Sequence, residues 1–298
     1  MRTIRPLTLP RRAFLASSLA LAACHKPEQG AAPAASAKGV RTLVDAVAGR
    51  WRMPGDRTRD RWRHPAESLA FWGLKPGMTV LEFWPGTGWY TDIIAPFLAA
   101  THGKLYEANI DADDPAEPSA RQAADAFAAK LKAAPRLYGE VVLTEFSARS
   151  GPVAPAGSCD LALFLRNLHN WMAAGIAEKA FHDAFAALKP GGVLGLEEHR
   201  AAPGGVQNAL APDGYVLEAY AIDLAAAAGF RLAGRSEINA NPKDSRDHPF
   251  GVWTLPPTRL SAPRGQAPQP NFDHTRYDLI GESDRMTLKF VKPERPAD

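Results

Sequence analysis

Short apolar runs alternate with longer amphipathic stretches over most of the chain. The apolar runs predict strands at 79–84, 104–110, 141–146, 160–165, 193–198, 230–238 and 286–291. Helical spacing predicts helices at 40–51, 89–100, 116–134, 173–188 and 213–228. The run at 160–165 is apolar nearly throughout, as expected for a central parallel strand that is covered on both faces. This order predicts an α/β fold with one doubly wound, mostly parallel sheet.

The first 23 residues do not fit this pattern. A basic stretch with four arginines and no acid precedes a short apolar run, which is typical of a secretory signal peptide. The segment Arg-Arg-Ala-Phe-Leu from Arg11 resembles a twin-arginine export signal, and Leu-Ala-Ala-Cys ending at Cys24 resembles a bacterial lipobox. We therefore predict a signal peptide at 1–23, a flexible tether at 24–39 and a folded domain at 40–298, anchored to the membrane through lipidated Cys24 in the periplasm. The alternative is a basic N-terminal helix with an incidental Cys24.

The charge balance changes once this leader is set aside. The whole chain has 35 basic and 32 acidic residues and a formal charge of +3. Removing the four leader arginines leaves 31 basic and 32 acidic residues, a charge of −1. The composition therefore gives no reason to expect a nucleic-acid partner. If Cys24 is acylated, Cys159 is the only other thiol, so we expect no internal disulfide and a buried Cys159.

The strongest chemical motif is Val-Leu-Glu-Phe-Trp-Pro-Gly-Thr-Gly at 80–88, an apolar strand that ends in an acid and a glycine turn. In doubly wound folds the ligand lies over this first turn. With Gly-Leu-Lys-Pro-Gly-Met-Thr at 73–79 and Leu-Lys-Pro-Gly-Gly-Val-Leu at 188–194, the chain from about residue 67 resembles the class I S-adenosylmethionine-dependent methyltransferases. It is most similar to a group of predicted, exported bacterial members with a Pro-Gly-x-Gly-Trp-Tyr turn, here at 85–90. The resemblance implies a Rossmann-like, seven-stranded sheet with an antiparallel last strand.

The resemblance also implies S-adenosylmethionine as cofactor and a set of residues that bind it: Glu82, Pro85, Gly86, Gly88, Asn109, Asp111, Glu145, Phe146 and Asn167. In the family, the acid at the position of Glu82 holds the methionine amino end of the cofactor. Glu145 and Phe146 fall where adenine contacts lie. A solvated acid and a core phenylalanine are the alternative interpretations of these two residues.

Two positions depart from the family pattern. Trp84 stands where the first motif glycine is usual, so we expect a reshaped turn. Asn109 stands where an acid normally binds the ribose hydroxyls, and Asp111 follows two residues later. An asparagine can still bond hydroxyls, but the bidentate carboxylate is lost unless Asp111 supplies it.

Polar residues follow the fourth and fifth strands at the edge where the cleft should open. His169 is the first candidate for a catalytic base, because its ordinary pKa of about 6.5 suits proton transfer near neutrality. The alternative is that His169 only caps the next helix and lines the cofactor pocket. His199 is the second candidate, with Glu197 or Glu198 to orient it, and ion pairing of these acids with Arg200 is the alternative. The eight histidines are scattered and no metal motif is present, so we predict no metal.

These observations give one leading hypothesis and one alternative. The leading hypothesis is methyl transfer to a small molecule, a lipid or an envelope component. The alternative is a non-catalytic ligand-binding envelope lipoprotein of the same fold, because the cofactor is made in the cytoplasm. We expect loops 201–212 and 239–270 to form the acceptor pocket. The Arg-rich segment 50–63 is either a salt-bridged cover of the core or a lip at the substrate site. The sequence does not predict an oligomeric state.

Overall fold

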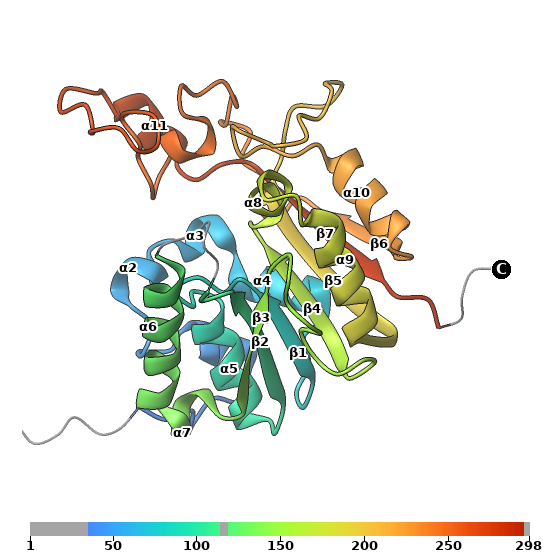
Figure 1. Cartoon of the computed structure of the whole chain (residues 1–298). Helices are drawn as coiled ribbons and strands as arrows, with labels where there is room; N and C mark the ends of the chain where they lie inside the picture. The colour runs from blue at the N-terminus through green and yellow to red at the C-terminus, as the bar shows by residue number, and fades with distance from the viewer. Residues whose placement is uncertain (1–34, 114–118, 295–298) are drawn as a thin grey trace, which may run out of the picture. The chain divides into compact units, whose positions relative to one another are not determined.

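The structure is a computed structural model that describes residues 35–113 and 119–294. A single twisted sheet forms its centre. Its strands lie in the order β3-β2-β1-β4-β5-β7-β6 (Figure 1). Only β7 runs antiparallel to its neighbours β5 and β6, while the other pairs are parallel. The predicted α/β fold with a mostly parallel seven-stranded sheet and an antiparallel last strand is therefore confirmed. The strands are β1 (Thr79–Phe83), β2 (Lys104–Ile110), β3 (Val141–Phe146), β4 (Cys159–Leu165), β5 (Leu188–His199), β6 (Arg231–Ser236) and β7 (Arg285–Val291).

Two hydrophobic clusters cover the two faces of this sheet. Because side chains alternate along a strand, Val80 contributes to one cluster and Leu81 to the other. The first face is covered by α4 (Pro65–Trp72), α5 (Thr91–Ala100), α6 (Ala120–Ala133) and α7 (Pro135–Tyr138). The second is covered by α8 (Leu168–Ala173), α9 (Ala177–Ala187) and α10 (Glu218–Ala227) (Figure 1). The sheet is thus buried between two helical layers, with Cys159 a buried, free thiol as expected.

Several predicted elements differ from the structure in their bounds. The helix predicted at 173–188 begins later, at Ala177, as α9; Gly175, with a φ of +68°, separates it from α8, which was not predicted and ends at Ala173. The helix predicted at 213–228 begins later, at Glu218, after a turn with Gly214 at φ +80°. Strand β5 extends back to Leu188, and the predicted Lys-Pro-Gly-Gly turn forms an irregularity within its pairing with β4.

The helix predicted at 40–51 is present as the shorter α1 (Leu43–Val47). Further short helices near both ends of the domain were not predicted: the N-terminal part also contains α2 (Pro54–Arg57) and α3 (Asp60–Arg63). The C-terminal part contains the 3-10 helix η1 (Gly251–Thr254) and α11 (Thr275–Ile280). Arg63 of α3 donates to Glu282, in the segment before β7, and Arg285 of β7 donates to the Trp62 carbonyl of α3, so these two parts of the chain are joined.

The topology fixes where a ligand can bind. The connections from β1 and from β4 run to opposite sides of the sheet, so the crevice at their carboxyl ends is a topological switch point. The predicted signal peptide and Cys24 lie outside the described residues. Within the described ranges, no helix combines the length and the apolar character needed to cross a bilayer.

Candidate functional site

The glycine turn leaves β1 at the switch point. Gly86 and Gly88 adopt φ angles of +61° and +86°, a region that side chains disfavour. A Cβ on Gly86 would meet nothing within 4 Å, and Gly86 is exposed. A Cβ on Gly88 would lie 2.9 Å from Lys130 Nζ and 3.0 Å from the Phe127 ring. Gly88 is therefore needed for packing against α6, whereas Gly86 borders open space that a ligand can enter. Pro85, the first residue of the predicted Pro-Gly-x-Gly-Trp-Tyr turn, is buried next to these glycines.

Trp84, which stands where the family pattern has its first glycine, gives the turn a fixed side-chain wall. Its φ is +46°, and its indole N–H donates to the Phe146 carbonyl at 2.9 Å. Because β1 and β3 are separated by β2, the ring crosses the carboxyl end of β2. Its edge contacts with Phe146 and Trp171, at centroid distances of 6.3 and 6.0 Å, hold it there. Asn167 Nδ2 donates to the Trp84 carbonyl at 3.0 Å, so Asn167 fixes the turn.

Phe146 is fully buried, which matches the core interpretation of this residue. Its ring packs against Phe83 at 5.1 Å and Trp171 at 5.6 Å between centroids. A ligand at this end of the cleft would meet the Trp84 ring before the Phe146 ring.

Glu82 and Glu107 form a pair of carboxyl groups beneath the turn. They are register partners on β1 and β2, and both are buried. Burial raises the pKa of Glu82 to about 7, although the Thr91 hydroxyl donates to its carboxylate at 3.1 Å. Burial and then the charge of Glu82 raise the pKa of Glu107 well above its ordinary value. Neither oxygen of Glu107 has a hydrogen-bond partner among the described residues. The pair therefore retains at least one proton near neutrality.

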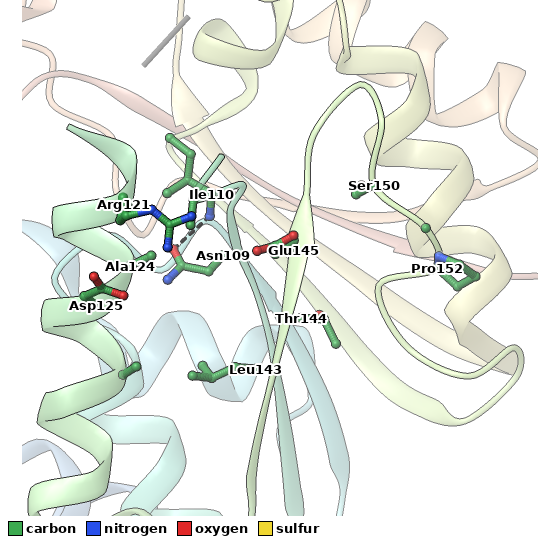
Figure 2. A pocket seen from close by; sticks show the side chains of 13 residues that line it. Asn109, Ile110, Arg121, Ala124, Asp125, Leu143, Thr144, Glu145, Ser150 and Pro152 are labelled. Carbon is green, nitrogen blue, oxygen red and sulfur yellow. Dashed lines mark hydrogen bonds between the residues drawn. The ribbon is translucent and has the colours of Figure 1, made fainter. Parts of the chain in front are cut away.

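An open groove lies at the ends of β2 and β3, with a cavity volume of about 550 Å³. Asn109 and Glu145 are register partners, and Figure 2 shows both facing Arg121 of α6 across the groove. Asn109 Oδ1 accepts from the Ile110 amide at 2.8 Å. Asp111 does not line this groove: it accepts from the Ser147 hydroxyl at 3.1 Å and from the Asp113 amide. The structure thus brings Asn109 and Glu145 together and directs Asp111 to the neighbouring loop.

His169 and Glu198 form a buried pair on the other side of the switch point. His169 Nδ1 lies 2.9 Å from Glu198 Oε1, and the Glu198 oxygens also accept from the amides of His169 and His199. A carboxylate can only accept, so Nδ1 carries the proton and Nε2 presents its lone pair. Glu198 therefore orients His169, whereas the sequence had suggested it as a partner of His199. Asn167 occupies the N-cap of α8, one residue before the helix that carries His169.

His199 lies beside this pair, with a ring-centroid distance of 5.2 Å to His169. Its Nδ1 lies 2.5 Å from the Ser283 hydroxyl. Burial lowers the pKa of His199 well below its ordinary value, and positive charge on His169, when that imidazole is protonated, and on Arg285 and Arg166 lowers it further. His199 is thus held neutral.

The fold also creates a cluster of metal-ligand types that the scattered histidines did not indicate. Ligand atoms of His169, Glu198 and His199 lie within 4.8 Å of one another. Both Glu198 oxygens already accept hydrogen bonds, and Arg166 and Arg285 place positive charge near His199. The cluster is therefore better suited to hydrogen-bonded proton transfer than to holding a cation.

Glu197 faces away from Glu198, as strand alternation predicted. It accepts from the Tyr90 hydroxyl at 2.9 Å and from Arg166 Nη1 at 3.2 Å, and Arg285 Nε lies 3.2 Å away. Arg200 does not pair with either of these acids; it pairs instead with Asp284 at 2.9 Å, and with Glu237. The predicted ion pairing of these acids with Arg200 is therefore wrong; Glu197 pairs with Arg166 and Arg285 instead.

A smaller cavity of about 280 Å³ joins these groups. Its lining includes both candidate bases and residues that sequence reasoning did not single out as functional: Arg59, Arg63, Arg166, Trp253, Glu282 and Ser283. Loop 239–270 contributes to this lining, as expected, and loop 201–212 does not. Arg59 and Arg63 belong to the Arg-rich segment 50–63, whose composition had suggested a lip at the substrate site.

No family model matches the chain, and no curated protein matches it. The fold is similar to that of a SAM dependent methyltransferase from Aquifex aeolicus, with a TM-score of 0.51, 14% identity, and coverage of 79% of this chain and 93% of that chain. It is also similar to a protein from Galdieria sulphuraria, proposed to be a sarcosine dimethylglycine methyltransferase, with a TM-score of 0.51, 16% identity, and coverage of 80% and 85%. The chain therefore has the fold of the S-adenosylmethionine-dependent methyltransferases.

Proposed function

We propose that the protein is an S-adenosylmethionine-dependent methyltransferase. The observation that carries this proposal is the position of the Glu82–Gly88 turn: it leaves the central strand at the switch point of a methyltransferase fold, and the oriented pair of His169 and Glu198 stands across the same crevice. Since a fold alone does not fix a function, the proposal depends on this combination of turn and base.

The residues around the turn fit the cofactor with one constraint. Gly86 leaves room for close approach of a ligand to the backbone, and Asn109 and Glu145 offer polar atoms at the ribose and adenine end. Trp84 forms a fixed wall at that end, because its N–H is bonded to the Phe146 carbonyl. Bound S-adenosylmethionine would supply a methyl group activated by the adjoining sulfonium.

His169 would accept the proton of the acceptor. Its Nδ1 is bonded to Glu198, its Nε2 forms no hydrogen bond with a described residue, and His169 lines the smaller cavity. The buried carboxylate of Glu198 fixes the tautomer of the imidazole and stabilises the imidazolium that forms as the proton is taken. His199 stands next to it and is the alternative base.

The decisive experiment is calorimetric titration of the purified protein with S-adenosylmethionine and with S-adenosylhomocysteine. We expect binding of both with a Kd of about 1 μM, and Glu82→Gln should weaken it by about tenfold or more through loss of the carboxylate beneath the turn. Glu140→Gln, an exposed glutamate, is the matched control. If folded wild-type protein binds neither compound, the proposal is wrong, and the alternative of a non-catalytic binding lipoprotein takes its place.

We further propose that the protein is a lipoprotein of the bacterial envelope, anchored through Cys24 and exposed to the periplasm. The leader motifs at Arg11 and Cys24 support this proposal. The acceptor would then be a small molecule, a lipid or an envelope component that is accessible from that compartment.

A further inference from the structure

Three guanidinium groups, those of Arg59, Arg63 and Arg166, line the smaller cavity, and Glu282 is the one carboxylate among its lining residues. Arg59, Arg63 and Arg285 all bond the single carboxylate of Glu282, at 2.7, 2.9 and 2.8 Å. Arg166 shares Glu197 with Arg285. Counting Arg285, which is not a lining residue, four guanidinium groups therefore pair with only two carboxylates, those of Glu282 and Glu197. The nearby Glu198 pairs with His169.

These arginines are not simply solvated by bulk water. The exposed fraction of the side chain is 22% for Arg59, 7% for Arg63 and 14% for Arg166. Arg285 is 1% exposed, and its Nε lies 3.2 Å from Glu197 Oε1 without forming a hydrogen bond with a described residue. Because removing unpaired charge from water is costly, an uncompensated cationic cluster at this depth favours binding of an anion.

The geometry of the donors supports the same conclusion. Arg59 and Arg63 bond Glu282 through Nε only, and among the described residues none accepts a hydrogen bond from their terminal Nη atoms. Both arginines line the cavity. A guanidinium edge with free Nη donors is suited to bidentate binding of a carboxylate or a phosphate.

The bases face the same cavity. His169 and His199 line it together with the arginines, and their Nδ1 atoms are committed to Glu198 and Ser283. Trp253 lies edge-on to His169 at a centroid distance of 5.8 Å and adds an apolar wall. We propose that the cavity binds an oxyanion, a carboxylate or phosphate group of the methyl acceptor, through Arg59, Arg63 and Arg166, and presents the acceptor to His169. This inference builds on the proposed methyltransferase function, because it names the class of acceptor.

The test is calorimetric titration of the whole protein, without cofactor, with inorganic phosphate and with acetate in a chloride buffer. We expect one-to-one binding of at least one of them, and the tighter one identifies the group that the acceptor carries. Arg59→Gln and Arg63→Gln should each weaken binding about tenfold, the usual effect of losing a charge-assisted hydrogen bond. Arg61→Gln, an exposed arginine of the same helix, should leave it unchanged.

The variants also separate the two proposals. Arg63 is buried, so its replacement can affect folding; Arg59→Gln, at a partly exposed position, gives an independent result. Absence of anion binding by folded wild-type protein, or equal weakening by Arg61→Gln, overturns the oxyanion site. If S-adenosylmethionine binds and neither anion does, only this inference fails. If an anion binds and S-adenosylmethionine does not, the oxyanion site stands and the methyltransferase proposal fails.

Discussion

At the scale of single residues, the molecule keeps two acidic groups where neither can be solvated. Glu82 and Glu107 lie side by side on β1 and β2, and burial raises the pKa of both. Each therefore binds its proton more tightly in the folded chain than in the unfolded chain. The free energy of unfolding accordingly falls as pH rises from the ordinary glutamate value of 4.5 through about 7 and above.

We predict that Glu107→Gln stabilises the protein at pH 8. The amide has the same shape, carries no charge and can donate to Glu82, so the variant avoids the cost of ionising the pair. The free energy of unfolding at pH 8 should rise by about 1 kcal/mol or more, while the difference at pH 5 should be small. Urea unfolding at both pH values measures this. Glu178→Gln, an exposed glutamate of α9, should show no such pH-dependent gain; equal stability of Glu107→Gln and wild type at pH 8 contradicts the paired-carboxyl account.

The sequence was informative about individual residues where a motif defined them. The turn with Gly86 and Gly88, and the candidate base His169 after β4, were all singled out from the sequence. The partner of Arg63, in contrast, is Glu282, which lies 219 residues away. No local pattern relates two positions so far apart, so the cationic cavity could be found only after the chain was folded.

At the scale of elements, strands were predicted better than short helices. Strands β2 and β3 have the predicted bounds, because a buried strand is defined by its own apolar run. Helices α2 and α3 have only four residues each, too short to be stable alone. Helix α3 is held by long-range contacts: Arg63 and the N-cap residue Arg59 bond Glu282, and Trp62 packs against Gly281. The conformation of α3 is therefore a property of tertiary packing.

This packing makes Gly281 a test of how the two ends of the domain are joined. A Cβ on Gly281 would lie 2.3 Å from the Trp62 ring, and its φ is +87°. Gly204 has a nearly equal φ of +85° but nothing within 4 Å of the added atom, so it is a matched control for backbone strain. Gly204→Ala should cost about 1 kcal/mol of unfolding free energy from the left-handed φ. Gly281→Ala should cost roughly 1–3 kcal/mol more, because α3 must shift.

Chemical denaturation of the two glycine variants gives the comparison directly. The strain common to both substitutions cancels, which leaves the contact between Gly281 and Trp62. Equal destabilisation would show that α3 moves aside at no cost and that the N-terminal wall of the smaller cavity is loosely held.

At the scale of the whole molecule, two separate cavities at the carboxyl edge of the sheet differ in polarity. One end carries Asn109 and Glu145 in the open groove that we propose for the nucleoside of the cofactor, and the other end carries guanidinium groups in a small cavity. The His169–Glu198 pair lies at the cationic end, and the glycine turn leaves the central strand β1. A methyl donor and an anionic acceptor would approach from opposite ends, which separates their binding determinants and lets each be tested alone.

The proposed location of the protein sets the last constraint on this arrangement. S-adenosylmethionine is made in the cytoplasm, so an exported enzyme would have to leave with its cofactor already bound, which permits a retained ligand but no ready turnover. Twin-arginine export carries folded proteins, and the single described cysteine, Cys159, is buried and free, so folding does not depend on an oxidising compartment.

We therefore predict that the chain folds before export and is then anchored through Cys24. Cys24→Ala should abolish incorporation of a labelled lipid precursor and release the protein from the membrane fraction, while binding of S-adenosylhomocysteine stays unchanged. Cys159→Ala, which removes the other thiol, should keep the label; a label that persists in Cys24→Ala places the anchor elsewhere and removes the argument for an envelope acceptor.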